Sequence, residues 1–243
     1  MTRVEADRCV VLVSGGLDSA VTLAVAVDGG FFPSALTVRY GQRHDVEIAA
    51  ARAVAAAVGV ERHLVLDVDL RSIGGSALTD DIAVPKGERT PGAEAIPPTY
   101  VPARNTILLS LALAFAESIG ARDLFLGVSS VDYSGYPDCR PEFVEAFERL
   151  ANRGTRAADG GRPYRVHAPL SRLSKAETVR LGLDLGVDLS VTRSCYDPLD
   201  GGRPCGGCEA CRLRARGFAD AGVADPALGA AREPGETEPG KGG

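Results

Sequence analysis

A glycine-containing hexapeptide, SGGLDS at Ser14 to Ser19, follows the apolar run at residues 9–13 and constrains this chain more than any other stretch. Glycine has no Cβ, so its backbone can approach an anion closely and adopt positive φ without strain. A helix that begins here would point its free N–H groups and the positive end of its dipole at the same anion. The spelling matches neither GxxxxGK[ST] nor GxGxxG, which excludes a Walker loop and a dinucleotide fingerprint. The alternative is an ordinary serine-capped helix, but the full string favours a strand–loop–helix phosphate site.

The composition is that of a globular protein. The chain has 243 residues, of which 45% are hydrophobic and 24% are charged, enough for one α/β domain with at most a small appendage. Its formal net charge is −5, whereas proteins that bind nucleic acid usually carry a basic surface. The N-terminus does not resemble a leader peptide, and no apolar run approaches about 18 residues. We therefore expect no nucleic-acid or membrane partner and a cytoplasmic location.

Strand-like and helix-like segments alternate, which is typical of an α/β fold with a doubly wound, mainly parallel sheet. Strands are predicted at 9–13, 34–40, 63–68, 124–128 and 164–168, and helices at 18–27, 45–58, 104–118, 142–152 and 175–185, the last capped by Ser174. We expect a nucleotide-binding α/β domain over 1–190 and a small four-cysteine segment over 191–220. Residues 224–243, rich in Pro, Gly and Glu, are expected to be a disordered tail.

Residues that could take part in binding or catalysis follow several of the predicted strands. SGGLDS, residues 40–42, residues 129–140 and the segment after Ala168 each come directly after one. Ligands of open parallel sheets bind outside the carboxyl ends of the strands. We therefore expect these segments to converge on one active site.

Four of the six cysteines cluster near the C-terminus with the spacing C-x9-C-x2-C-x2-C, namely Cys195, Cys205, Cys208 and Cys211. In a reducing compartment, such a cluster indicates a metal site rather than disulfides. Four thiolates complete the tetrahedral coordination of one Zn²⁺ ion and leave no open position, which indicates a structural site. An iron–sulfur cluster and a redox CxxC pair are the alternatives.

The two remaining cysteines have different settings. Cys9 lies in the first predicted strand and is expected to be a small buried apolar residue. Cys139 lies in an irregular loop beside Arg140, whose charge could activate a thiol. It is either a nucleophile or a loop residue without a chemical role.

SGGLDS resembles the pyrophosphate loop (PP-loop) of the ATP pyrophosphatase superfamily, whose members adenylate a carboxyl, carbonyl or amide oxygen. Further strings are YGQRH at 40–44, VPARN at 101–105, DYSGYPDCRPEF at 132–143, PL at 169–170 and SKAET at 174–178. With the four cysteines, they resemble the 7-cyano-7-deazaguanine synthase (QueC) family of the queuosine precursor pathway, from about residue 9 to residue 218. Leu17 falls at the variable loop position, the interval from Cys195 to Cys205 is slightly long, and the tail is unmatched.

The resemblance implies a sheet of the adenine nucleotide alpha hydrolase type and a nitrile-forming reaction. Its substrates would be 7-carboxy-7-deazaguanine, ATP and ammonia, and its product 7-cyano-7-deazaguanine. Adenylation makes the carboxylate oxygen a good leaving group, ammonia then gives an amide, and a second activation of the amide oxygen allows the nitrile to form. No second domain resembling a glutaminase is expected, because the 243 residues leave no room for one, so free ammonium is the expected nitrogen source. The family resemblance also suggests a homodimer.

Three residues are expected to be catalytic. Asp18 would lie close to Mg²⁺, Lys175 would clamp phosphate, and Arg104 would bind phosphate or the substrate carboxylate. Lys175 could equally be a solvated residue at the start of a helix. The nucleotide is expected to contact one continuous run, consisting of Val13, Ser14, Gly15, Gly16, Leu17, Asp18, Ser19, Ala20, Val21, Thr22 and Leu23.

Substrate contacts are expected in the DYSGYPDC stretch. A guanine-like edge calls for a carboxylate acceptor, which Asp132 or Asp138 could supply, and Tyr133 or Tyr136 could stack on the ring. His44 could be a residue at the start of a helix with no chemical role.

Other functions share part of this pattern. A tRNA thiolase or lysidine synthetase would also carry SGGLDS, but it should have a basic surface, and the DYSGYPDC stretch would be unexplained. A second alternative keeps the fold but activates another acid. A third is a nucleotide-binding scaffold without catalytic activity.

Overall fold

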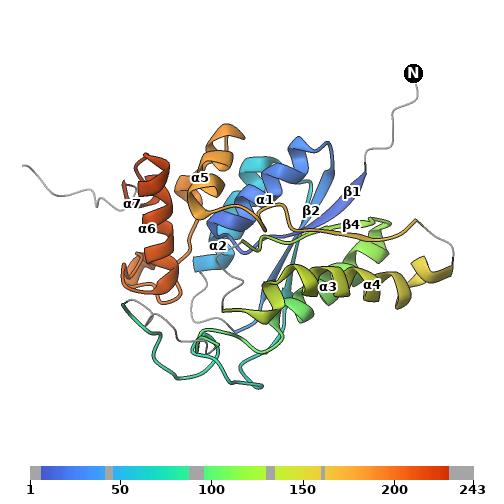
Figure 1. Cartoon of the computed structure of the whole chain (residues 1–243), viewed down its shortest axis with the longest axis horizontal. Helices are drawn as coiled ribbons and strands as arrows, with labels where there is room; N and C mark the ends of the chain where they lie inside the picture. Colours follow the sequence, from blue (N-terminus) through green and yellow to red (C-terminus); the bar gives the residue numbers. More distant parts are fainter. Residues whose placement is uncertain (1–6, 42–45, 88–95, 130–134, 160–161, 230–243) are drawn as a thin grey trace, which may run out of the picture.

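The computed structural model describes residues 7–41, 46–87, 96–129, 135–159 and 162–229. Within these residues, five parallel strands form one sheet in the order β3-β2-β1-β4-β5 (Figure 1). They are β1 Arg8–Leu12, β2 Phe32–Arg39, β3 Arg62–Asp67, β4 Asp123–Phe125 and β5 Arg165–His167. The strand order reverses direction between β1 and β4, where Val10 lies opposite Leu124. Such a reversal opens a crevice at the carboxyl ends of the two strands.

Helices cover both faces of the sheet (Figure 1). One face carries α1 Leu17–Asp28, α2 Val46–Val58 and α5 Lys175–Asp184, and the other carries α3 Arg104–Ile119 and α4 Pro141–Arg153. At one end of the molecule, α6 Glu209–Ala221 packs against α5 and is followed by α7 Pro226–Gly229. Short 3-10 turns occur at η2 Pro137–Cys139, η3 Arg156–Asp159, η4 Leu189–Val191 and η5 Asp200–Gly202. The predicted fold class, an α/β doubly wound parallel sheet, is confirmed.

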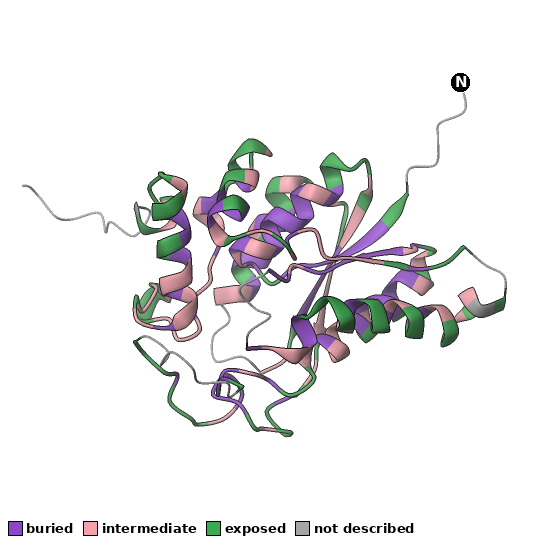
Figure 2. Cartoon of the chain, in the orientation of Figure 1, coloured by how far each residue is buried: buried purple, intermediate pink, exposed green. Residues whose placement is uncertain are grey.

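Side chains alternate along the strands and so divide the core into two layers. Buried residues, purple in Figure 2, lie along the strands and on the helices that cover them. Val10 and Leu12 of β1 face α3 and α4, whereas Cys9 and Val11 face α1 and α2. All four are buried, as expected for a strand covered on both faces. Cys9 is therefore the buried apolar residue that the sequence predicts.

The end of β4 departs from the prediction. Pairing stops at Phe125 rather than continuing to residue 128, after a last hydrogen bond from the Leu126 N–H to the His167 carbonyl at 2.9 Å. The chain then crosses the start of α1 so closely that a Cβ on Gly127 would lie 3.2 Å from the carbonyl carbon of Asp18. This crossing ends the strand and brings residues 126–128 to the crevice.

The first residues of the predicted tail are among those that the structure describes. Residues 226–229 form α7, and the Asp225 carboxylate pairs with Arg214 of α6 at 2.6 Å. Both side chains are less than 10% exposed, so the order of the chain extends past residue 224. The rest of the predicted tail, residues 230–243, lies outside the described residues.

No helix among the described residues is long and apolar enough to cross a membrane.

Candidate active site and metal centre

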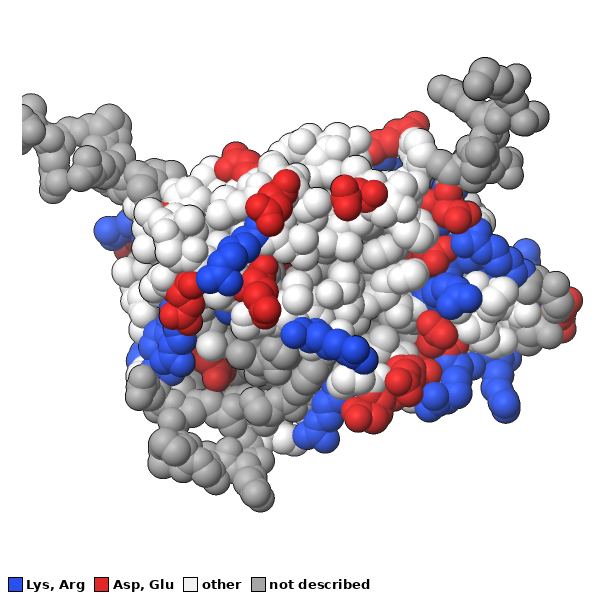
Figure 3. All heavy atoms as spheres, turned by 45° about the horizontal axis from the view of Figure 1, so that its top comes forward, with Lys and Arg blue, Asp and Glu red and all other residues white. Residues whose placement is uncertain are grey.

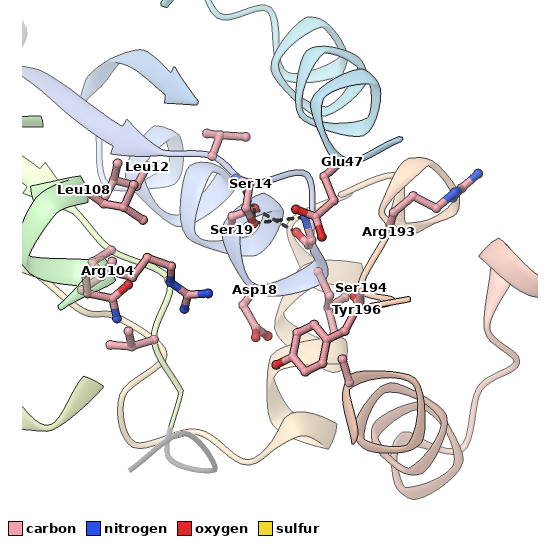
Figure 4. Close-up of a pocket in the computed structure, with 18 of the residues that line it drawn as sticks. Leu12, Ser14, Asp18, Ser19, Glu47, Arg104, Leu108, Arg193, Ser194 and Tyr196 are labelled. Carbon is pink, nitrogen blue, oxygen red and sulfur yellow. Dashed lines mark hydrogen bonds between the residues drawn. The ribbon is translucent and has the colours of Figure 1, made fainter. Parts of the chain in front are cut away.

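A pocket of about 260 Å³ opens at the carboxyl ends of β1, β2 and β4, beside the reversal of strand order. Its lining includes Ser14 of the loop after β1, Tyr40 after β2, Tyr136 after β4, and Lys175 after β5. The four segments predicted to converge therefore do so in the described residues. Figure 4 shows the loop and Asp18 on one side of this pocket and Arg104 on the other.

The loop after β1 is held in shape by its own side chains and by α2. Gly15 has φ of +84°, and a Cβ there would lie 2.5 Å from the Ala51 nitrogen and 2.6 Å from the Glu47 carbonyl oxygen. The Ser14 N–H donates to Ser19 Oγ, and Ser19 Oγ donates to the Gly16 carbonyl at 3.0 Å. No side chain caps α1, so the helix presents its N-terminus to the pocket. This is the geometry of an anion site.

Lys175 and Asp18 form an ion pair at the loop. The lysine Nζ lies 2.8 and 2.7 Å from the two carboxylate oxygens, and the two side chains are 14% and 24% exposed. Lys175 is the first residue of α5, whose start is fixed by a capping box between Ser174 and Glu177. The structure therefore brings two of the three predicted catalytic residues into contact.

Arg104 stands at the opposite end, in the first turn of α3. The preceding Ala103 has φ of 53° and is the only non-glycine residue with positive φ among those described. A left-handed residue other than glycine costs about 1–2 kcal/mol, and here the turn is supported by a hydrogen bond from the Ala103 N–H to the Tyr100 hydroxyl at 3.1 Å. This turn starts α3 at a point where the Arg104 guanidinium faces the pocket (Figure 4).

Tyrosines surround this end of the pocket. Tyr40, Tyr136 and Tyr196 all line it, and the Tyr136 hydroxyl is 2.8 Å from Thr99 Oγ1. Burial raises the pKa of Tyr40 and Tyr136 above the ordinary value, although the positive charge of Arg104 opposes this shift. Both hydroxyls therefore stay protonated at neutral pH and can donate hydrogen bonds.

Glu47 lines the pocket from the first turn of α2, on the side of the phosphate loop (Figure 4). Burial raises its pKa from 4.5 to about 7, and the charge of Arg104 limits the rise. Glu47 is therefore partly protonated near neutral pH. The negative charge of the pocket is smaller as a result, which favours anionic ligands.

Asp138 takes a different position from the one predicted for a base-binding carboxylate. Its Oδ2 accepts the backbone N–H of Asn105 at 2.9 Å, and its carbonyl oxygen accepts from the Asn105 side chain at 3.0 Å. Asn105 Nδ2 also lies 3.2 Å from Cys139 Sγ, and both Asp138 and Cys139 are buried. Of these two, only Cys139 lines the pocket. The geometry gives Asp138 the role of holding the start of α3.

The four predicted metal ligands come together beside α6. Their Sγ atoms all lie within 4.8 Å of one another, and Cys195 and Cys208 are 4.0 Å apart. A tetrahedral ion with metal–sulfur bonds of about 2.3 Å needs sulfurs roughly 3.8 Å apart, so the set fits one ion. Lys86 Nζ lies 3.1 Å from Cys205 Sγ and 2.7 Å from Asp197, and so offsets part of the thiolate charge.

Other predicted residues are distributed unevenly. Of the predicted nucleotide-binding run, Val13, Ser14, Gly16, Leu17, Asp18 and Ser19 line the pocket. Ala20, Val21, Thr22 and Leu23 are buried inside α1 packing and are not among the lining residues. His44, Asp132 and Tyr133 lie outside the described residues.

Sequence reasoning missed part of the lining. Arg193, Ser194 and Tyr196 come from the segment just before and after the first metal-ligand cysteine, and Glu47 comes from α2. The Arg193 N–H donates to the Gly15 carbonyl at 2.8 Å, so this segment also braces the phosphate loop. The one signal in the sequence is their proximity to Cys195. A cysteine cluster predicts a metal site, and it does not by itself indicate that its neighbours also line the pocket.

A doubly wound parallel sheet with an SGGxDS phosphate loop at its switch point defines the PP-loop class of ATP-utilising enzymes. The family model "Queuosine biosynthesis protein QueC" matches residues 8–222. The chain belongs to the QueC family.

Curated relatives agree with this membership. The "7-cyano-7-deazaguanine synthase" of Paramagnetospirillum magneticum is 62% identical over 219 residues, which is 90% of this chain and 96% of that protein. The protein of the same name from Xanthomonas axonopodis pv. citri is 65% identical over the same shares. The chain is therefore an enzyme, a ligase that forms carbon–nitrogen bonds.

Solved structures match more distantly. NMN synthetase from Francisella tularensis has a TM-score of 0.49 and 15% identity, covering 90% of this chain and 79% of that one. A 4-thiouridine synthetase in complex with RNA and ATP has a TM-score of 0.46 and 17% identity, covering 93% of this chain and 54% of that one. Likeness at this level carries no functional argument.

Proposed function

We propose that this enzyme uses ATP and ammonia to convert 7-carboxy-7-deazaguanine into 7-cyano-7-deazaguanine. The observation that carries the proposal is a single pocket with two different ends: an anion-binding loop with Lys175 and Asp18 at one, and Arg104 among tyrosines at the other. Joining an acid to a nucleotide requires both to be held together and oriented. Relatives that are 62% and 65% identical are named for the product, 7-cyano-7-deazaguanine, and the acid that we propose is the one the family resemblance implies.

At the phosphate end, the loop from Ser14 to Ser19 and the start of α1 hold the triphosphate. Lys175 Nζ, now on Asp18, turns toward a phosphate oxygen when ATP binds. Asp18 would then be free to hold Mg²⁺, an ion that would supply neutralisation of the charge on the pyrophosphate group. The carboxylate oxygens of Asp18 suit this hard cation.

At the acid end, Arg104 pairs with the substrate carboxylate and Tyr136 packs on the deazaguanine ring. The carboxylate oxygen attacks the α-phosphorus and pyrophosphate leaves. Ammonia then attacks the acyl carbon, AMP leaves with that oxygen, and the amide forms. A second adenylation, on the amide oxygen, lets AMP leave as the last N–H proton is lost to give the nitrile. Roles for Asp132 and Tyr133 at this end stay predictions.

The metal centre holds one Zn²⁺ per chain in a structural role, because four thiolates leave no coordination position for a substrate. The sulfurs lie around one point, whereas the thiolates of an iron–sulfur cluster bind different irons. The same proposal includes a 191–220 zinc segment, a homodimer and a cytoplasmic enzyme. Among the described residues on the face in Figure 3, Lys and Arg are interspersed with Asp and Glu, whereas nucleic-acid sites usually carry a clustered basic surface.

The test is product formation by the purified, metal-replete enzyme. With ATP, Mg²⁺, ammonium and 7-carboxy-7-deazaguanine, mass spectrometry should detect the nitrile and an amide precursor. Asp18→Asn should abolish turnover, while the matched control Asp28→Asn, at the exposed far end of the same helix, should not. Turnover with another acid only, or with bulk tRNA only, would replace this proposal with one of its alternatives.

A further inference from the structure

One face of α6 connects the metal centre to the active site. Cys211, Arg214 and Gly217 are spaced three residues apart and are all buried, so they lie on the same side of the helix. Cys208, the N-cap residue, and Phe218 extend this buried face at its two ends. The α6 face defined by these five residues begins at the cysteine cluster and continues under α5.

Gly217 lies directly against the catalytic lysine. A Cβ on Gly217 would be 2.4 Å from Lys175 Cγ, 3.1 Å from its Cβ and 3.3 Å from its carbonyl carbon. Two of these atoms belong to the base of the side chain and the third to the main chain, so none can move aside without moving the whole lysine. Lys175 therefore reaches Asp18 through space that exists only because residue 217 has no side chain.

Arg214 acts on the phosphate loop from the same face. Its guanidinium donates to Thr192 Oγ1 at 2.8 Å and to the Leu189 carbonyl at 3.2 Å, and it is paired with Asp225. It thereby fixes the segment whose Arg193 N–H holds the Gly15 carbonyl. Two residues of one helix thus contact two different supports of the phosphate end.

We propose that α6 is a positioning helix for the phosphate end of the pocket, with Gly217 setting the place of Lys175 and Arg214 bracing the loop. A glycine inside a helix is destabilising relative to alanine, so the presence of Gly217 is explained by the lysine rather than by the helix. The inference deepens the proposed function and rests on it for the role of Lys175.

A double-mutant cycle between Gly217→Ala and Lys175→Ala tests the contact. In the wild-type background, Gly217→Ala should lower kcat/KM for ATP at least about tenfold and weaken binding of a non-hydrolysable ATP analogue in calorimetry. In the Lys175→Ala background, where Cγ is gone, the same substitution should change analogue affinity less than about twofold. The matched control Ala219→Gly, on the exposed face of α6, should leave turnover unchanged.

Stability supplies a second readout. If Gly217→Ala does not fold, the Lys175→Ala/Gly217→Ala double variant should recover folding, because the severe 2.4 Å conflict with Lys175 Cγ has been removed. Equal effects of Gly217→Ala in both backgrounds, in affinity and in stability, would overturn the inference. Binding of the analogue needs no acid substrate. Absence of nitrile formation by the wild-type enzyme would therefore refute the proposed function, while the double-mutant cycle could still be measured and interpreted.

Discussion

At the phosphate end of the pocket, the loop residues come from one hexapeptide that packs on α2. At the acid end, Arg104, Tyr136 and Tyr196 come from three segments far apart in the sequence. The first end is an arrangement of backbone, shaped by glycine and by the start of a helix. The second is an arrangement of side chains, which exists only once the sheet has formed. The nucleotide site can therefore be predicted from one local motif. The residues that would select the acid substrate come together only in the folded protein.

The largest effect is expected for Gly15→Ala. Gly30→Ala is the comparison, because the two glycines share the same backbone conformation but differ in their surroundings. Gly15 and Gly30 have φ of +84° and +83°, but a Cβ on Gly15 meets α2 at 2.5 Å and one on Gly30 meets nothing within 4 Å. Both Gly→Ala changes incur about 1–2 kcal/mol of left-handed strain. Gly15→Ala should in addition displace the loop and lower kcat/KM for ATP at least about 100-fold, while Gly30→Ala keeps turnover. Similar losses in both variants would show that strain alone matters.

At the other end, Arg104→Ala should act on the acid. Removing a charge-assisted hydrogen bond worth about 1.5–3 kcal/mol should raise KM for 7-carboxy-7-deazaguanine roughly 10- to 100-fold. Affinity for a non-hydrolysable ATP analogue, measured by calorimetry, should stay within about twofold. Arg149→Ala, exposed on α4, is the control. Equal weakening for acid and nucleotide would contradict a division of the pocket into two ends.

A truncation pair asks how far the support of the phosphate end extends. A chain ending at Gly229 should melt like the full chain. A chain ending at Val223 loses Asp225 and leaves the Arg214 charge buried without its partner, which should cost about 3–5 kcal/mol of unfolding free energy. Equal melting curves for the two chains would indicate that residues 224–229 do not contribute to stability, as expected for a tail that begins at residue 224.

The smallest expected effect concerns Glu47, whose charge state couples the two ends through Arg104. Its folded pKa of about 7 exceeds the ordinary 4.5 because of burial. The folded protein thus binds a proton that the unfolded chain releases, so this group lowers stability as pH rises from about 4.5 to 7 and keeps it lowered above. Glu47→Gln should raise the unfolding free energy at pH 8 by at most about 3 kcal/mol and leave it unchanged near pH 4. A constant difference at all pH values would reject this titration.

The sheet, the helices α1 to α5 and the phosphate loop can be predicted from the sequence because each has a local signal. Apolar runs indicate the strands, helical spacing indicates the helices, and glycines indicate the loop. The sequence does not predict α6, whose buried face is Cys211, Arg214, Gly217 and Phe218, with only one ordinary apolar residue. Glu47 and Tyr196 leave no local signal either, since only the fold brings them to the pocket. Asp138 presents the opposite case: a carboxylate in a functional motif holds a helix start through Asn105, and its contact with the substrate stays a prediction.

The origin of the oxygen in AMP tests the central claim most directly. With 7-carboxy-7-deazaguanine labelled with ¹⁸O in its carboxylate, adenylation transfers one labelled oxygen to AMP when ammonia displaces it. Labelled AMP together with unlabelled pyrophosphate is the expected result. Label in inorganic phosphate, or AMP without label during nitrile formation, would contradict it.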